Sequence, residues 1–316
     1  MDIFEAKSIK PMLIGKESAP FDDPNYLYEL KWDGERCLAY VDPKNGTELR
    51  NKRNVRMLPK VPELEPIYKQ VKKRCILDGE LLVLKDGKPD FSEIQRRSLM
   101  SDRFRIDLLS KSLPATFVAF DILYHDNNAT LMLPLIERKT LLEKAFTDSP
   151  RLAVSRYVEG RGCALFDLAQ KQELEGVVGK QKDSIYIQDK RTQSWVKMKV
   201  MMDDDFVICG YIHKTGNMTS IVLGQYRNSS LIYKGHVTLG VSGQAFEFIS
   251  KYPRIQSAPF SAYPSGHGNE HAVWLEPGLV CTVKFMHRTK SGGMRQPVFK
   301  GLRKDKSAFD CTERQP

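Results

Sequence analysis

The sequence predicts an α+β protein of two domains, with a mixed domain of helices and strands over residues 1–202 and a small β-barrel over residues 203–316. Three observations favour this fold class. The chain has 316 residues, which at about 150 residues per domain is enough for two hydrophobic cores. Its content of 41% hydrophobic and 28% charged residues is typical of a folded protein. After Asp203-Asp204-Asp205 the pattern changes to short β runs broken by turn residues.

The expected helices and strands follow from the apolar runs and from the turn and capping residues that bound them. In the first domain we expect strands at 26–32, 36–42, 75–84, 116–124, 176–180 and 194–200. Helices are expected there at 63–74, 91–100, 134–146 and 162–174. In the second domain we expect β runs at 206–211, 220–225, 231–240 and 279–289, a helix at 242–252, and a hairpin turn at Asn228-Ser229-Ser230.

Composition excludes several classes of protein. No stretch approaches the roughly 18 apolar residues of a membrane span, and the N-terminus lacks a basic region followed by an apolar run. The six cysteines are scattered without a C-x-x-C pair, which argues against zinc ribbons and disulfide frameworks. We therefore expect a cytoplasmic protein with reduced thiols and no membrane association. The net charge of +10 points to a polyanionic partner, although many soluble proteins are mildly basic.

The strongest local signal is Glu29-Leu30-Lys31-Trp32-Asp33-Gly34-Glu35-Arg36. Side chains alternate along a strand, so Glu29 and Lys31 share one face. Asp33-Gly34 is typical of a tight turn that returns the chain as the next strand. This arrangement would present Lys31 at a strand end with Arg36 nearby. The alternative is a solvated lysine beside an ordinary hairpin.

Four further motifs follow in order. Ile76-Leu77-Asp78-Gly79-Glu80 begins a buried strand, with Asp78 and Glu80 on one face. Phe120 lies in an aromatic strand that indicates either core packing or a base-stacking platform. Leu174-Glu175-Gly176-Val177-Val178-Gly179-Lys180 comes next. In Trp195-Val196-Lys197-Met198-Lys199-Val200 the two lysines share a face, which suits phosphate binding or a simple polar edge strand.

The histidines carry no convincing site. His267 and His271 have the spacing of two metal ligands on a helix. They lie, however, in and after Pro264-Ser265-Gly266-His267-Gly268, a segment that favours a polar loop.

The ordered set of motifs resembles the covalent nucleotidyltransferase superfamily of polynucleotide ligases and mRNA capping enzymes. The tail, with Trp274-Leu275-Glu276-Pro277-Gly278 and Arg295-Gln296-Pro297-Val298-Phe299-Lys300-Gly301-Leu302-Arg303-Lys304-Asp305-Lys306, is similar to that of ATP-dependent DNA ligases of the bacterial end-joining type. Pro11-Met12-Leu13 and the segment 91–97 match the same group. The resemblance implies the minimal two-domain form, an adenylyltransferase (ATP-grasp-like nucleotidyltransferase) domain followed by an OB-fold.

The resemblance also implies a mechanism that seals 5′-phosphate/3′-hydroxyl nicks in duplex DNA. Lys31 would attack the α-phosphate of ATP, and the AMP would pass to the DNA 5′-phosphate before the 3′-hydroxyl displaces it. Mg²⁺, with Mn²⁺ as an alternative, would supply positive charge that activates the lysine and stabilises the transferred phosphoryl group. The implied nucleotide and metal contacts are Glu29 at the adenine amino group, Phe120 stacking on adenine, Arg36, Lys197 and Lys199 near the phosphates, Arg53 at AMP or the nick phosphate, and Glu80 and Glu175 at the metal. Arg303 and Lys306 would reach the β- and γ-phosphates when the OB domain closes about a hinge near Val200–Asp205.

Two departures from the family pattern stand out. The S-R-N-G motif appears as Lys52-Arg53-Asn54-Val55, which changes the expected backbone beside the nick phosphate. The acid usual in the strand after Leu279 is replaced by Thr282. The alternatives to a DNA ligase are an RNA ligase or capping-type guanylyltransferase, and a catalytically dead OB-containing DNA-binding module.

The expected partner is nicked double-stranded DNA, bound by a monomer. A Ku-type end-binding protein is a second partner that the resemblance implies, with repair without Ku and plasmid or phage roles equally compatible.

Residues 284–316 carry a net charge of +6, and residues 50–60 carry five basic side chains and no acid. Both segments suit phosphates and predict salt-sensitive binding. Arg96, Arg97, Arg103 and Arg105 in the stretch 85–111 would help to clamp DNA or belong to a solvated helix and loop.

Overall fold

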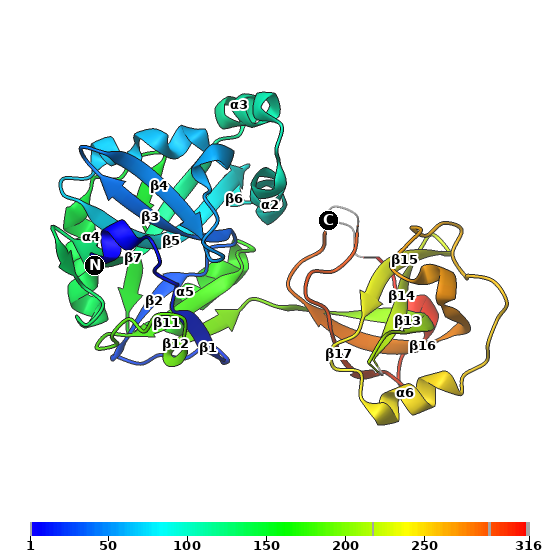
Figure 1. Cartoon of the computed structure of the whole chain (residues 1–316). Coiled ribbons are helices and arrows are strands. Elements are labelled where there is room, and N and C mark those ends of the chain that lie inside the picture. Colours follow the sequence, from blue (N-terminus) through cyan, green and yellow to red (C-terminus); the bar gives the residue numbers. More distant parts are fainter. Residues whose placement is uncertain (1, 217, 290–291, 314–316) are drawn as a thin grey trace. The chain divides into compact units, whose positions relative to one another are not determined.

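The computed structural model describes residues 2–216, 218–289 and 292–313, and it divides into two compact units, Met1–Val200 and Met201–Pro316 (Figure 1). The boundary expected from the sequence, after residue 202, lies two residues beyond this division. Lys290 and Arg314, which contribute to the expected basic tail, lie outside the described residues. Among the described residues, no helix has the length and apolar character needed to cross a bilayer.

The first unit contains two packed sheets. One has the strand order β1-β12-β11-β2-β10 and the other β4-β3-β5-β7-β8, with β6 paired to β5 and β9 to β7. The strands are β1 (Leu13–Glu17), β2 (Tyr26–Leu30), β3 (Glu35–Asp42), β4 (Gly46–Asn51), β5 (Cys75–Lys85), β6 (Lys88–Pro89), β7 (Ala115–His125), β8 (Asn128–Ala129), β9 (Leu152–Val154), β10 (Tyr157–Glu159), β11 (Gly176–Gln181) and β12 (Arg191–Lys199).

Helices surround these sheets. They are α1 (Ile3–Ala6), α2 (Phe91–Leu99), α3 (Arg103–Ser112), α4 (Leu135–Ala145), α5 (Gly162–Lys171) and the 3₁₀ helices η1 (Leu58–Lys60) and η2 (Pro62–Gln70). Asp90 and Asp102 cap α2 and α3 by accepting backbone N–H groups of the first turn. The helix expected at 63–74 is instead η2, because Pro66 inside it lacks the N–H that an α-helix requires.

The hairpin expected at Asp33-Gly34 is wrong. β2 pairs with β10 and β11, whereas β3 pairs with β4 and β5, so the segment between them crosses from one sheet to the other. Gly34 makes this crossing against β5, where a Cβ would overlap the carbonyl oxygen of Leu81. The close approach of backbones therefore requires glycine for a reason that a hairpin turn does not involve.

The two sheets meet through a shared apolar cluster. Leu38, Tyr40, Ile76 and Phe120 from one sheet pack with Trp195 from the other and with Tyr186 from the segment between β11 and β12. A larger core lies among β3, β4, β5, β7, η2 and α4 and includes Leu49, Leu64, Leu77, Phe117 and Leu142. Because both faces of the β3-β5-β7 sheet are covered, the motif side chains on its inner face are held between two packed layers.

The second unit is a β-barrel with the strand order β15-β14-β13-β16-β17. Its elements are β13 (Met202–His213), β14 (Thr219–Arg227), β15 (Ser230–Val237), α6 (Gly243–Ser250), η3 (Asn269–His271), β16 (Val273–Phe285), β17 (Val298–Leu302) and η4 (Ala308–Asp310). Leu239, just beyond β15, bridges Val298 of β17 and joins the two edges. Asn228 and Ser229 both have positive φ, as a tight hairpin turn between β14 and β15 requires.

The loop expected around His267 is confirmed. Gly266, His267 and Gly268 all have positive φ, which an α-helix does not tolerate. His271 ends the short η3 turn. Within residues 2–216, 218–289 and 292–313, no group of three or more His, Cys, Asp or Glu side chains has the arrangement of a metal site.

Candidate nucleotide site

One face of the first sheet forms one side of a pocket. Strand pairing aligns Glu29, Val178 and Lys197 in one row, and Leu27, Lys180 and Trp195 in the adjacent row. The backbone N–H of Lys31 donates to the carbonyl of Gly176, which extends the pairing by one residue beyond β2. Side chains in register on neighbouring strands share a face, so Glu29, Lys31, Lys180 and Trp195 project together.

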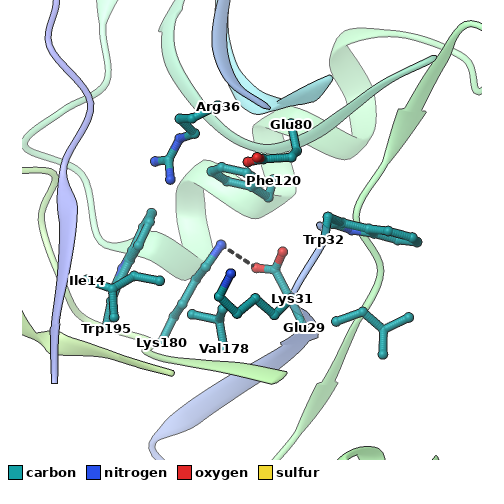
Figure 2. A pocket seen from close by; sticks show the side chains of 11 residues that line it. Ile14, Glu29, Lys31, Trp32, Arg36, Glu80, Phe120, Val178, Lys180 and Trp195 are labelled. Atoms are coloured by element: carbon teal, nitrogen blue, oxygen red, sulfur yellow. Dashed lines mark ion pairs between the residues drawn. The ribbon is translucent and has the colours of Figure 1, made fainter. Parts of the chain in front are cut away.

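The opposite side comes from the second sheet. Figure 2 shows Arg36, Glu80 and Phe120 facing Glu29 and Lys31 across the pocket. Arg36 and Glu80 are paired residues on β3 and β5. Phe120 lies where the pairing of β5 with β7 shifts register, and such bulges re-aim side chains. The complete lining is Ile14, Glu29, Leu30, Lys31, Trp32, Arg36, Glu80, Phe120, Val178, Lys180 and Trp195.

Lys31 is the pocket lysine at the end of β2. Its Nζ lies 2.6 Å from Glu175 Oε1, and its side chain keeps 21% of its surface exposed. Burial raises the pKa of Glu80 to about 8, with the charges of Arg36 and Lys31 opposing that rise. Lys31 is therefore a reachable amine beside two carboxyl groups, one paired and one favouring its neutral form.

Cations lie against the aromatic rings of the pocket. The Arg36 guanidinium is 4.4 Å from the centre of the Phe120 ring, and Lys180 Nζ is 4.4 Å from the ring centres of both Phe120 and Trp195. Burial lowers the pKa of Lys180 to about 8, although Glu29 at 2.8 Å favours its charged form. Phe120 thus serves the apolar core and also presents a ring to the pocket.

A buried network fixes Arg36. Its Nε and Nη2 each lie 2.6 Å from an oxygen of Asp78, forming a two-bond pair. The Tyr186 hydroxyl donates to Asp78 at 2.6 Å and accepts the backbone N–H of Met12 at 2.9 Å. Burial would lower the pKa of Arg36, but the charge and hydrogen bonds of Asp78, together with Tyr186 and Glu80, raise it above its usual value, so the guanidinium stays charged.

The remaining expected residues of this unit lie outside the pocket lining. Lys197 and Lys199 share a face as expected, while Val196, Met198 and Val200 are buried on the other. Both lysines approach Glu17, at 3.2 Å and 3.5 Å. Arg53 is exposed in the turn after β4, where Asn51 Oδ1 accepts the backbone N–H of Arg53. Asn54 supplies the positive φ of that turn, so the altered motif still forms a tight loop.

Arg303 and Lys306 lie together on the barrel. Lys306 Nζ is 2.8 Å and Arg303 Nη1 3.3 Å from Asp205 Oδ2, and Thr282 Oγ1 donates to Asp205 Oδ1 at 2.6 Å. Arg303 also forms two bonds to Asp305, at 2.9 and 2.8 Å. Burial alone would raise the pKa of Asp205, but the bonds from Lys306 and Thr282 and the nearby charges hold it below its usual range.

Comparison with known proteins assigns both units to one family. A family model described as ATP dependent DNA ligase domain matches residues 6–199, and one described as ATP dependent DNA ligase C terminal region matches residues 214–306. The chain belongs to the ATP-dependent DNA ligase family. Its two units are accordingly the adenylyltransferase domain and the OB-fold domain expected of such a DNA ligase.

Relatives of this ligase support the bacterial end-joining type. The chain is 30% identical over 297 residues to the SPbeta prophage-derived DNA ligase-like protein LigB of Bacillus subtilis, covering 93% of this chain and 99% of the relative. It is 29% identical to the multifunctional non-homologous end joining protein LigD of Pseudomonas aeruginosa over 92% of this chain but only 35% of that protein. The chain thus spans about a third of that relative.

Solved structures agree with the fold. The mycobacterial DNA ligase D complexed with ATP and MES has a TM-score of 0.56 and 27% identity, covering 98% of this chain and 99% of that one. A Lig E DNA ligase described as binding DNA with a minimal scaffold has a TM-score of 0.61 at 17% identity, over 93% of this chain and 100% of that one, a likeness in fold.

Several residues of the ligase pocket are not among the site residues expected from the sequence. Trp32, Lys180 and Trp195 belong to the sequence motifs, and strand alternation with Glu29 and Lys197 would have placed Lys180 and Trp195 on the pocket face. Ile14 follows the Pro11-Met12-Leu13 segment but carried no signal of its own for the pocket. Tyr186, which holds Asp78 behind the pocket, lies between the motifs and gave no signal either. Lys139, on α4, contacts Glu29 and also lies outside every motif.

Proposed function

We propose that this ligase seals 5′-phosphate/3′-hydroxyl nicks in duplex DNA through a lysyl-AMP on Lys31 and a DNA-adenylate. The observation that carries the proposal is the placement of Lys31, a partly exposed amine at a strand end that faces Phe120, Arg36 and Glu80 across one pocket. The amine bonds to the α-phosphorus of ATP as pyrophosphate leaves. The AMP then passes to the DNA 5′-phosphate, and the 3′-hydroxyl displaces AMP.

The pocket supports the binding of adenosine. Phe120 and Trp195 offer ring faces for the base, and Glu29 offers a carboxylate for its amino group. Arg36 would contact the sugar and phosphate side while Asp78 and Tyr186 hold it in place. Lys197 and Lys199 would leave Glu17 for the negatively charged phosphates, and Arg53 would meet AMP or the nick phosphate from its exposed turn.

Glu80 and Glu175 fit a divalent cation. Mg²⁺ prefers one or two carboxylates together with phosphate oxygens, and Mn²⁺ accepts the same ligands. Glu175 is paired with Lys31, and the charge of Glu175 contributes to the raised pKa of Glu80, so the two carboxyl groups are close enough to interact. A bound Mg²⁺ would neutralise phosphate charge. Glu80 would give up its proton on binding it, and Glu175 would release Lys31 as a nucleophile.

Arg303 and Lys306 are proposed to reach the pyrophosphate leaving group during the first step. Both are partly exposed, at 40% and 28% of the side-chain surface, although they pair with Asp205. Motion about a hinge near Val200–Asp205 would bring the barrel to the pocket for adenylylation and release it for DNA.

The decisive experiment is incubation with ATP and Mg²⁺ followed by intact-protein mass spectrometry. Wild type is expected to gain the mass of one AMP, and Lys31→Ala is expected to gain none. Lys85→Ala, which changes an exposed lysine of β5, is the matched control and should label like wild type. Folded wild type without an adduct would argue for a catalytically dead DNA-binding module.

Substrate tests distinguish the DNA ligase from enzymes that transfer nucleotides by the same chemistry. Labelled ATP and GTP distinguish an adenylyltransferase from a capping-type guanylyltransferase, and nicked DNA and nicked RNA distinguish the DNA ligase from an RNA ligase. We expect sealing of nicked DNA with ATP and not with GTP. The rate should fall as salt rises, because binding of the protein to DNA phosphates releases counterions. The end-joining relatives add one further comparison, the joining of linear DNA ends with and without a Ku-type end-binding protein.

A further inference from the structure

A buried lysine outside the motifs contacts the pocket carboxylate. Lys139 on α4 is fully buried, and its Nζ lies 2.7 Å from Glu29 Oε1. Lys180 Nζ lies 2.8 Å from the same oxygen, as the dashed line in Figure 2 marks. Lys139 Nζ is also 5.6 Å from the ring centre of Tyr157. One carboxylate oxygen therefore meets two buried ammonium groups, although one would balance its charge.

Two buried cations for one anion carry a desolvation cost. A buried ionic group is expected to be kept only when its partners repay that cost. Lys180 faces the pocket and also contacts Phe120 and Trp195. Lys139 is absent from the pocket lining, so its effect on a ligand must pass through Glu29.

We propose that Lys139 is a positioning residue that determines base specificity, by occupying Oε1 of Glu29 and keeping this carboxylate ionised as an acceptor for a 6-aminopurine. The inference rests on the proposed adenylyltransferase function and adds to it a residue on α4. An ionised carboxylate only accepts hydrogen bonds. Adenine presents an amino donor at position 6, whereas guanine and hypoxanthine present a carbonyl acceptor. A protonated carboxyl group would instead donate to that carbonyl.

The charges around Glu29 support this role for Lys139. Burial would raise the pKa of Glu29, but the two lysines hold it below its usual value. The titratable and charged groups that face this carboxyl group or its partners include Lys139 from α4, Lys180 from β11, Tyr157 from β10, Lys31 from the end of β2 and Asp121 from β7. Glu143 of α4 and Glu159 of β10 add negative charge near Tyr157. Removing one lysine leaves burial opposed by fewer positive charges, so the pKa of Glu29 will rise.

The test compares nucleotide selectivity across pH in Lys139→Met. Self-nucleotidylation is measured with ATP and with inosine triphosphate between pH 6 and pH 8. Once the pKa of Glu29 in the variant exceeds the assay pH, each further unit of that rise lowers the ionised fraction about tenfold. We therefore expect the ratio of kcat/KM for ATP to that for inosine triphosphate to fall several-fold at pH 6. The loss should shrink as pH rises, while the wild-type ratio changes little.

Two further variants make the result decisive. Lys144→Met changes an exposed lysine on the same helix and should leave the ratio and its pH dependence unchanged. Lys139→Gln keeps a buried hydrogen-bond donor without the charge and should show the same pH-dependent loss of selectivity for ATP. It replaces Lys139→Met in the test if the circular dichroism spectrum of Lys139→Met shows that this variant is unfolded. An unchanged ratio in a folded Lys139 variant overturns the inference. Absence of any wild-type adduct would instead overturn the proposed function.

Discussion

The lysines proposed to hold Glu29 and the barrel cations proposed to reach the phosphates are paired in different ways. In the adenylyltransferase domain, Lys139 and Lys180 meet Glu29 with side chains that are 0% and 3% exposed. On the barrel, Arg303 and Lys306 meet Asp205 with 40% and 28% of their side-chain surface exposed. Buried pairs in a low dielectric are strong and costly to break, whereas exposed pairs contribute little and are screened by salt.

This difference matches two mechanical needs. A pocket that recognises a base benefits from groups already fixed before the ligand arrives, because less entropy is lost on binding. Under the proposed mechanism, Arg303 and Lys306 must exchange the Asp205 carboxylate for a phosphate and return. Burial therefore suits Glu29 and its lysines, and partial exposure suits Arg303 and Lys306.

The largest expected effect comes from breaking a buried pair. Arg138 and Asp121 are both fully buried and share two bonds, at 2.8 and 2.9 Å. Asp121→Asn leaves the Arg138 charge buried and unbalanced, so the free energy of unfolding should fall by about 3–5 kcal/mol. Urea denaturation followed by tryptophan fluorescence measures it, with Asp107→Asn as the exposed control. A loss comparable to that of the control would contradict the contrast between buried and exposed pairs.

Removing Arg303 and Lys306 from the barrel should slow the self-adenylylation step and leave the sealing step largely unchanged. In the double variant Arg303→Ala/Lys306→Ala, self-adenylylation is expected to slow by about 100-fold or more, since removing a preorganised donor to developing charge typically costs that much. Sealing of a pre-adenylylated nick should change far less. Rapid-quench assays of the two steps give the comparison, and equal loss in both steps would show that these side chains do not serve the first step alone.

A smaller effect is expected from Asp205→Asn. The folded-state pKa of Asp205 lies below its usual value, so its ionisation stabilises the barrel above the ordinary carboxyl range. The variant should lose about 1 kcal/mol at pH 7. The difference from wild type should disappear as the pH falls through the ordinary carboxyl pKa of about 3.9 and below it. Urea titrations at several pH values, with Asp310→Asn as control, measure this; a difference independent of pH would exclude the ionic explanation.

The smallest effect is expected at a largely exposed pair. Lys111 lies 3.0 Å from Asp107 on α3, and its side chain is 75% exposed. Lys111→Ala should shift the melting temperature by less than about 2 °C, because exposed helix pairs contribute little. Differential scanning fluorimetry of both proteins at low and high salt measures the shift. A large shift here would remove the distinction between the two kinds of pair.

The sequence predicted the features that depend on local patterns, such as the alternation of side chains along a strand. Alternation along strands placed Lys197 and Lys199 on one face, and the apolar run after Cys75 predicted the buried strand that carries Asp78 and Glu80. The change to short β runs broken by turn residues after Asp203-Asp204-Asp205 separated the mixed domain from the barrel. The ordered motifs also led to the ligase family through resemblance.

What the sequence did not predict depends on contacts between distant segments. Asp33-Gly34 has the composition of a hairpin turn, yet the pairing partners of β2 and β3 lie in different sheets. Tyr186 reaches Asp78 across 108 positions in sequence, and Lys139 reaches Glu29 from a helix with no motif of its own. No local pattern encodes such contacts, because they arise only when the two sheets pack.

The crossing at Gly34 has a consequence for how this pocket tolerates change. β2 contributes lining residues to one side of the pocket, and β3 and β5 contribute them to the other. Gly34 lies where the chain passes from one side to the other. The spacing between Lys31 and Glu80 therefore depends on a residue that contributes no side chain. An added methyl group there would collide with Leu81, Leu82 and Glu80 of β5, so the crossing or the strand that carries Glu80 would have to shift.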